Sequence, residues 1–241
     1  MSKFFCTILF VLTLFLCQSC VWNLGNDYFV DEAKDFLTDN FDDTFTYESI
    51  SKNDNKTYVR FKASNLNNTT VTVQITEEKE SLISVSHSFK SNYLCCRFAQ
   101  QEASYYEDFF EEYFSECRIT IDNSNRFIDY HGVWYVLEES SGEWIEHTNR
   151  NPDFETYLNI IKDSKPKNCI TIVVTSPGSN AFLTNEDLLK ASLADLQQGN
   201  IKLDGNFYIV NSMNDNYEQN HVMAAKIIAN DNSKYKYNLL Q

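Results

Sequence analysis

The chain has 241 residues, of which 43% are hydrophobic and 15% aromatic, so it can bury one large core or two small ones. Its formal net charge of −14 excludes a general nucleic-acid binder, which needs a basic face to replace phosphate counterions. The same charge disfavours docking on anionic lipid and favours a cationic protein or ligand as a partner. Solubility alone is the competing explanation of so acidic a chain. Any such partner is expected where acids are densest: 39–43, 77–80 and 107–116.

The first 20 residues have the pattern of an export signal. Lys3 gives a positive start, residues 4–16 contain only Phe, Leu, Ile, Val, Thr and one Cys, and small residues follow. A helix that crosses a bilayer needs about 20 apolar residues, so this run is too short to span one. We therefore predict a signal peptide over residues 1–19 and an exported protein.

Cys20 directly follows this signal, which predicts a diacylglyceryl anchor on its sulfur and a place on the outer face of the cell membrane. Bacterial lipoprotein signals usually carry Leu three residues before that Cys, where this chain has Cys17. The same bond suits an ordinary signal peptidase, which would leave a secreted protein with Cys20 as a thiol or a disulfide partner. In either case residues 20–26 form a short tether. Loss of Lys3 with the signal changes the net charge from −14 to about −15.

After the tether, the pattern predicts a helix and then an antiparallel meander. Residues 27–40 carry apolar side chains at helical spacing: Phe29, Ala33, Phe36 and Leu37. Turns rich in Asn follow at 53–55 and 65–68. Alternating polar and apolar residues predict strands over 44–49, 58–63, 70–76 and, shorter, 82–85.

Residues 97–116 predict a second helix with an aromatic stripe, which is more typical of a core than of a ligand platform. The stripe contains Phe98, Tyr106, Phe109, Phe110, Tyr113 and Phe114. Acids are expected to cover the rest of this helix: Glu102, Glu107, Asp108, Glu111 and Glu112. We expect the stripe to lie on the meander and the chain to leave through Cys117 into a strand that ends near Ile121.

The second half of the chain alternates helical and strand patterns. Pro152 opens a helix, residues 170–174 predict a strand buried on both faces, and Thr184 and Gly199 bound a further helix. Residues 207–210 and 235–239 predict strands. Residues 217–225 predict a helix, with a strand over 224–229 as the alternative.

The predicted fold class is therefore α+β. A helix and antiparallel β-meander occupy residues 27–122, an irregular connection covers 123–150, and a second α+β subdomain covers 151–241.

The cysteines other than Cys20 show no zinc or redox spacing. Cys117 and Cys169 each open a β-like run, so they would form a disulfide if those two strands were neighbours. Buried free thiols are the competing interpretation, and they also suit the adjacent Cys95 and Cys96.

No pattern predicts a catalytic residue, a metal ligand or a cofactor. The four histidines lie far apart in the sequence: His87, His131, His147 and His221. Three Asn-Asp-Asn tripeptides are typical of turns rather than of a calcium loop. Ser176 follows an apolar strand but lacks the G-x-S-x-G pattern of a nucleophile elbow.

An export signal that ends in Cys, followed by a chain rich in Asn, Lys and Phe, resembles bacterial lipoproteins in composition. This resemblance implies an envelope location and carries over no functional residue. The sequence thus predicts an envelope-anchored lipoprotein that acts as a non-enzymatic binding or interaction module. The alternatives are an exported hydrolase, whose acids or thiol converge only in the fold, and a purely structural surface protein.

Overall fold

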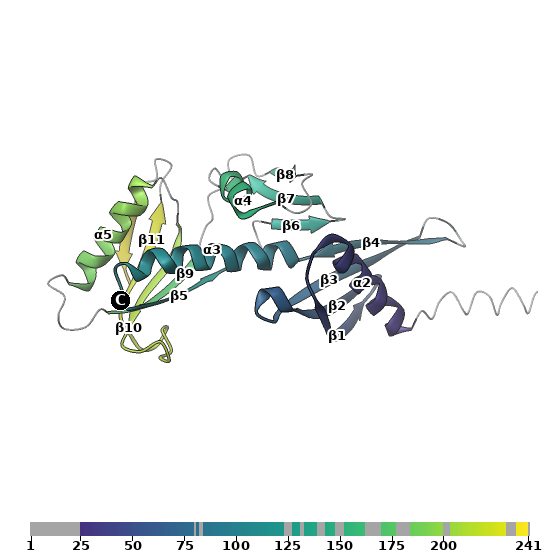
Figure 1. Cartoon of the computed structure of the whole chain (residues 1–241), viewed down its shortest axis with the longest axis horizontal. Coiled ribbons are helices and arrows are strands. Elements are labelled where there is room, and N and C mark those ends of the chain that lie inside the picture. Colours follow the sequence, from purple (N-terminus) through teal and green to yellow (C-terminus); the bar gives the residue numbers. More distant parts are fainter. Residues whose placement is uncertain are drawn as a thin grey trace, which may run out of the picture. The chain divides into compact units, whose positions relative to one another are not determined.

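A computed structural model describes residues 25–79, 81, 84–122, 127–130, 133–138, 143–147, 152–161, 170–176, 184–199, 203–229 and 235–240 (Figure 1). The predicted signal, most of the tether and Cys20 lie outside these residues. The chain divides into two compact units, Met1–Lys90 and Ser91–Gln241, so the predicted boundary at residue 122 falls inside the second unit. No helix in the described ranges is long and apolar enough to cross a membrane.

Unit 1 consists of one helix and a four-stranded meander. The elements are α2 (Asn26–Asn40), β1 (Phe45–Asn53), β2 (Lys56–Ala63), β3 (Thr69–Lys79) and β4 (Val85–Ser91), with the strands in that order in the sheet. Asp54, Asn67 and Asn68 adopt left-handed backbone conformations, which Asn and Asp tolerate better than other side chains. These residues lie in the two predicted turns. The predicted helix and the first three predicted strands are also confirmed.

The core of unit 1 lies between α2 and the sheet. The helix buries Phe29, Ala33 and Leu37, which recur every four residues. Every second residue of the two central strands is buried with them: Val59, Phe61, Ala63, Val71, Val73 and Ile75. The fourth strand begins at Val85 rather than ending there, and residues 82 and 83 of the predicted strand lie outside the described ranges.

Unit 2 contains a long helix, α3 (Tyr93–Glu111), and a five-stranded sheet of order β12-β11-β10-β9-β5. These strands are β5 (Glu116–Ile121), β9 (Ile170–Thr175), β10 (Gly205–Val210), β11 (His221–Ala229) and β12 (Tyr235–Leu239). β9 and β10 are parallel, and α5 (Asn185–Gln198) connects them; the other pairs are antiparallel. A parallel pair needs such a crossover connection. The fold class is thus α+β, as predicted.

Two helices cover one face of this sheet. Phe110 and Phe114 of α3 contact Phe207 of β10, with ring centroids 6.0 and 5.5 Å apart. The hydroxyl of Tyr113 donates a hydrogen bond to Asp195 and so joins α3 to α5. The helix side of the core includes Leu189, Leu193 and Leu196 of α5, and the sheet side includes Ile119, Ile172, Phe207 and Ala225. The aromatic stripe is therefore core, as expected, but Phe98, Phe110 and Phe114 contact aromatic residues of unit 2, whereas the meander on which they were expected to lie belongs to unit 1.

Local signals for β9 and α5 are confirmed. β9 buries residues of both faces, including Ile172 and Val173. Thr184 caps α5 by accepting a hydrogen bond from the backbone N–H of Asp187, whose carboxylate accepts one from the backbone N–H of Thr184. Gly199 is the C-cap of this helix.

Two segments of unit 2 differ from the predictions, although the strand given as the alternative over 224–229 lies within β11 (His221–Ala229). The helix expected at 217–225 is a turn followed by β11, because pairing with β10 and β12 outweighs the weak helical pattern. The irregular connection at 123–150 contains the antiparallel strands β6 (Phe127–Tyr130), β7 (Val133–Glu138) and β8 (Glu143–His147). Strands of four to six residues are too short to show a clear alternation in the sequence.

Gly205 at the start of β10 is required by close packing of the backbone. A Cβ atom at this position would lie 1.9 Å from the carbonyl oxygen of Ile170 and 2.7 Å from its carbonyl carbon. Only glycine therefore allows β10 to pair with β9 at this point.

Candidate functional site

The five-stranded sheet of unit 2 has a second face, opposite to α3 and α5. Side chains alternate between the two faces of a strand, so the chain neighbours of the buried Phe207 and Ala225 point away from the helices. We call this side the open face. Its strand residues are Glu116, Arg118, Thr120, Thr171, Val173, Thr175, Asn206, Tyr208, Val210, Ala224, Lys226, Ile228, Lys236 and Asn238.

Five polar side chains form one line across the open face. The pairings between neighbouring strands place Thr120 beside Thr171, Thr171 beside Asn206, Asn206 beside Lys226, and Lys226 beside Asn238. We call this line the polar row. Neighbouring strands are about 4.8 Å apart, so its four intervals span roughly 19 Å. The three central side chains are half-buried and the two at the ends are exposed.

The side chains of the polar row have no polar partner in the part of the chain that the structure describes. None of the five donates or accepts a side-chain hydrogen bond or joins an ion pair with another described residue. The row therefore offers two amides, two hydroxyls and one ammonium group to whatever contacts this face. Their polar atoms are not among the side-chain atoms buried without a partner, so they reach solvent and are available to a ligand.

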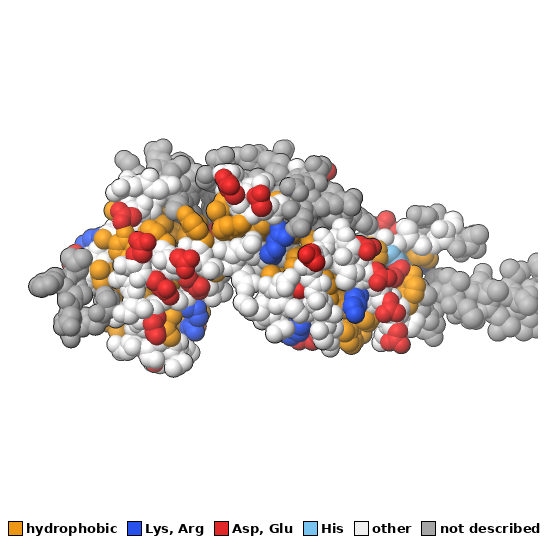
Figure 2. All heavy atoms as spheres, viewed as in Figure 1, with side chains coloured by type: hydrophobic (Ala, Val, Ile, Leu, Met, Phe, Trp, Pro, Cys, Tyr) orange, Lys and Arg blue, Asp and Glu red, His pale blue; other side chains and the backbone are white. Residues whose placement is uncertain are grey.

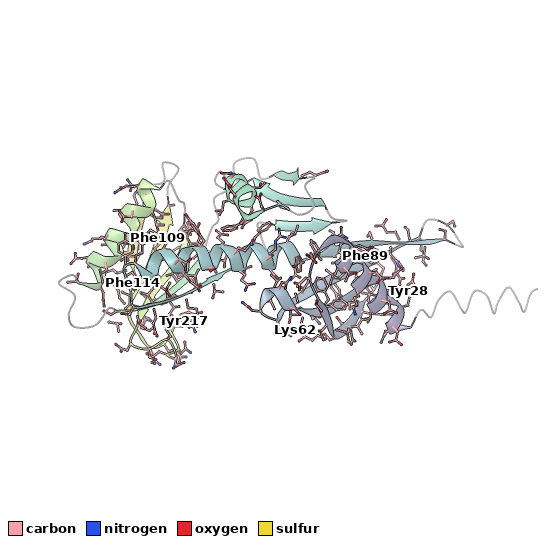
Figure 3. All side chains as sticks on the ribbon, viewed as in Figure 1. Tyr28, Lys62, Phe89, Phe109, Phe114 and Tyr217 are labelled. Carbon is pink, nitrogen blue, oxygen red and sulfur yellow. The ribbon has the colours of Figure 1, made fainter. Side chains whose placement is uncertain are left out.

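An apolar line runs next to the polar row. Arg118 pairs with Val173, Val173 with Tyr208, and Tyr208 with Ala224. Both Val173 and Ala224 are only 2% exposed. The ring of Tyr208 packs against Tyr217, with centroids 5.0 Å apart. Figure 3 shows Tyr217 in the turn between β10 and β11, below Phe109 of α3 in this view.

The hydroxyl of Tyr208 stays protonated well above neutral pH. Burial raises its pKa, and the nearby carboxylate of Glu218 raises it further. Tyr208 thus adds a hydrogen-bond donor and a ring to the open face. His221 also contacts this ring, at 5.8 Å between centroids.

The open face carries more cations than the chain as a whole would suggest. Arg118, Lys226 and Lys236 form no ion pair with a described residue, whereas Glu116 is the acid on these strands. The whole chain has 34 acids and 20 Lys or Arg. Acids are scattered over the face of unit 2 that Figure 2 shows, with few Lys or Arg among them. Asp122 and Asp204 lie just beyond strand ends and already have partners.

Unit 1 has a separate polar cluster that the sequence did not suggest. Nδ1 of His87 on β4 lies 2.6 Å from Oε2 of Glu32 on α2, and the hydroxyl of Tyr28 donates to Oε1 at 2.5 Å. This hydrogen bond, followed by burial, raises the pKa of Tyr28 to about 12. Phe29 packs against the imidazole at 5.6 Å. Both carboxylate oxygens of Glu32 are thus engaged: Oε1 with Tyr28 on the same helix, and Oε2 with His87 on β4.

A buried acid joins α3 to the helix α4 (Phe154–Ile161). Glu102 is 1% exposed, contrary to the expectation that it covers the outer side of α3, and its Oε2 accepts a 2.9 Å hydrogen bond from Tyr157. Tyr157 also stacks on Phe98 at 4.1 Å between centroids. Nη2 of Arg97 donates to the carbonyl oxygen of Pro152 at 2.6 Å. These contacts lie inside the core, so they support a structural role for Glu102.

The predicted disulfide between Cys117 and Cys169 stays a prediction, since Cys169 lies outside the described residues. Cys117 is a half-buried free thiol on β5. The two strands are neighbours, as the prediction required, but they are antiparallel. Cys117 pairs with Val174, whereas Ile170 pairs with Ile121 at the other end of β5. β9 therefore begins at the end of β5 remote from Cys117, which weighs against the bridge.

The structure does not test lipid attachment at Cys20. Within the described ranges, no group of three or more His, Cys, Asp or Glu side chains is arranged to hold a metal ion. His221 contacts Tyr208 and His87 lies in unit 1, whereas His131 lies outside the described residues. Ser176 donates a 2.8 Å hydrogen bond to Asn185 at the start of α5.

No protein-family model, curated protein or solved structure matches this chain.

Proposed function

We propose that this protein is a non-enzymatic binding module of the bacterial cell envelope, held outside the membrane by a lipid on Cys20. Its binding surface is the open face of unit 2. The observation that carries the proposal is the polar row, in which five hydrogen-bonding side chains stand in one line without a described partner.

A sheet is a suitable support for such a surface. Asn206 and Lys226 project from neighbouring strands in the middle of the sheet, and their chain neighbours Phe207 and Ala225 are fixed in the core on the other side. The positions of the polar groups are thus set before a ligand arrives, which reduces the entropy lost on binding.

The N-terminal sequence supports the location. The charged start, the apolar run and Cys20 form an export signal with a lipid acceptor, and α2 begins at Asn26, the last residue of the tether. The membrane is therefore a partner through the anchor, and nucleic acid is not a partner of so acidic a chain.

Two conspicuous acids have structural contacts that account for their positions. Glu32 binds Tyr28 on its own helix and His87 on β4, and Glu102 is buried against Tyr157. An exported hydrolase stays the alternative. It would require two carboxylates about 5–10 Å apart in a cleft.

The proposal is tested by photo-crosslinking in intact cells. A benzophenone amino acid replaces Thr120 on the open face, and in a second strain it replaces Lys34, an exposed residue of α2. We expect an adduct of raised mass from position 120 alone. The adduct should disappear when Asn206→Ala and Lys226→Ala are added, because these remove the centre of the polar row.

Equal adducts from both positions, or no adduct from position 120, would contradict the assignment of the open face. Cell fractionation of the Cys20→Ala variant tests the anchor separately. The variant should appear in the medium or remain as uncut precursor, and wild-type protein found only in the medium would contradict the lipid anchor.

A further inference from the structure

We propose that the ligand of the open face is an anionic, hydroxyl-rich glycan. This inference rests on the proposed function of the open face as a binding surface, and it names the chemistry of what binds there.

Hydroxyl groups are the chemistry that the polar row matches best. Asn206 and Asn238 each offer an amide that both donates and accepts, and Thr120 and Thr171 each offer a hydroxyl that does the same. A sugar hydroxyl also donates and accepts, so each of these side chains can form a hydrogen bond with it as donor or as acceptor. The groups recur about every 4.8 Å across the sheet, which suits an extended chain of sugar rings lying across the strands.

The cations of the open face select for negative charge. Lys226 lies inside the polar row, Arg118 lies in the adjacent line of β5, and Lys236 lies on the edge strand β12. None of the three is neutralised by a described carboxylate. The acid on the strands of this face is Glu116 at the start of β5, and Glu218 acts electrostatically on Tyr208. Charge complementarity therefore favours a ligand whose carboxylates or sulfates are spaced along a hydroxyl-rich chain.

Single-stranded nucleic acid fits the open face less well. Such ligands need aromatic side chains on which successive bases stack. Tyr208 is the aromatic residue on the strands of this face, and its ring already packs against Tyr217 and His221. A neutral glycan would leave the three cations without a partner.

The test measures binding of three soluble probes to the mature chain by isothermal titration calorimetry at one ionic strength. The probes are an alginate oligomer, which is anionic and rich in hydroxyls, a dextran oligomer, which is neutral, and oligo-dT. We expect alginate to bind and the other two to bind at least tenfold more weakly. Addition of salt should weaken alginate binding because charge contributes to it.

Matched variants assign the binding to the open face. Lys226→Ala and Asn206→Ala should each weaken alginate binding by about tenfold, since each removes a group that contacts the ligand. Lys34→Ala removes the same charge from an exposed position of α2 and should leave binding unchanged. Thermal unfolding of each variant checks that the fold is retained. If the Lys226→Ala variant is unstable, Lys226→Arg is measured as well. It keeps the charge and should retain most of the binding.

Dextran binding as tight as alginate binding would overturn the anionic class, and tighter binding of oligo-dT would replace the glycan by nucleic acid. No binding of any probe, or equal loss with Lys34→Ala, would also overturn the inference. The crosslinking experiment distinguishes failure of the glycan inference from failure of the proposed function of the open face. An adduct at position 120 in which mass spectrometry finds peptides of a second protein leaves the binding surface in place and rejects the glycan.

Discussion

Asn206 on β10 and Lys226 on β11 lie directly opposite each other on the open face, and neither side chain has a polar partner among the described residues. Their chain neighbours, Phe207 and Ala225, are also opposite each other, but they are fully buried under the helices. One strand pair thus contributes the centre of the core on one side and the centre of the candidate binding surface on the other.

Replacement of Phe110 should strongly destabilise unit 2. The ring is fully buried and contacts Phe207, so Phe110→Ala leaves a cavity and costs about 3–5 kcal/mol. Urea unfolding measures this loss. Tyr105→Ala on the same helix is the control, because Tyr105 is 44% exposed and should cost far less. Equal midpoints for the two variants would show that the aromatic stripe is not core.

Gly205→Ala should destabilise the sheet although it adds only one methyl group. The new Cβ would meet the backbone of Ile170, so β9 and β10 must move apart or the strand must bend. We expect a loss of more than about 1 kcal/mol in thermal unfolding. Gly25→Ala is the matched control because nothing lies within 4 Å of its added Cβ. An unchanged midpoint for Gly205→Ala would contradict the close contact.

The thiols of Cys96 and Cys117 should be unreactive in the native protein at pH 8. Burial raises the pKa of Cys96 to about 11, and burial together with Glu107 and Glu111 raises the pKa of Cys117 to about 12. Thiolate, the reactive form, is therefore scarce until the pH is far higher. Alkylation followed by peptide mass spectrometry measures each thiol. Both should react readily at the same pH in urea without reductant.

The same experiment decides the predicted disulfide. A bridged Cys117 would stay unmodified in urea until a reductant is added, together with Cys169.

The raised pKa values also predict how stability changes with pH. A thiol that is neutral when folded and ionised when unfolded contributes stability below about pH 9, and this contribution is lost as the pH rises towards 11 or 12.

A cationic partner should contact the C-terminal end of α3. Asp108, Glu111, Glu112 and Glu116 are exposed there, and the last turn of the helix has no basic residue. Carboxylates near a helix C-terminus are unfavourable because the macrodipole is negative there. Glu111→Gln and Glu112→Gln should therefore raise stability slightly and weaken binding of polylysine. Asp35→Asn, on an exposed position of α2, controls for the change in net charge.

Polylysine binding should weaken as salt rises, because exposed charges are screened over about 8 Å at physiological ionic strength. If α3 variants and Asp35→Asn weaken it equally, net charge alone explains the interaction. Other acids of the predicted contact segments are engaged within the fold. Asp43 accepts hydrogen bonds from the backbone of Thr44 and Asn65, and Glu107 accepts one from Ile119.

Local signals in the sequence were sufficient for many elements. The cap at Thr184, the stop at Gly199 and the alternation around Val73 depend on neighbours a few residues away, and all three were predicted. β11 was predicted only as a strand over 224–229 in place of a helix, because its strand character depends on pairing with β10 and β12. The burial of Glu102 depends on Tyr157, which is 55 residues away.

The candidate site was beyond sequence reasoning for a related reason. Thr120 and Asn238 are the two ends of the polar row, and they meet the same face only after five strands have been paired in one register. Each residue alone is an ordinary polar side chain on the solvent side of a strand. Glu32 and His87 likewise come together only when α2 packs on β4.

The most direct test of the binding surface is an NMR titration of the mature chain with the alginate oligomer, observing the side-chain amides of Asn206 and Asn238. These signals and the backbone signals of Thr171 and Lys226 should shift with one common affinity. Backbone signals of Val59 and Val73 in the core of unit 1 should stay unchanged. Absence of any shift in the polar row, or shifts confined to unit 1, would contradict the assignment of the open face as the binding surface.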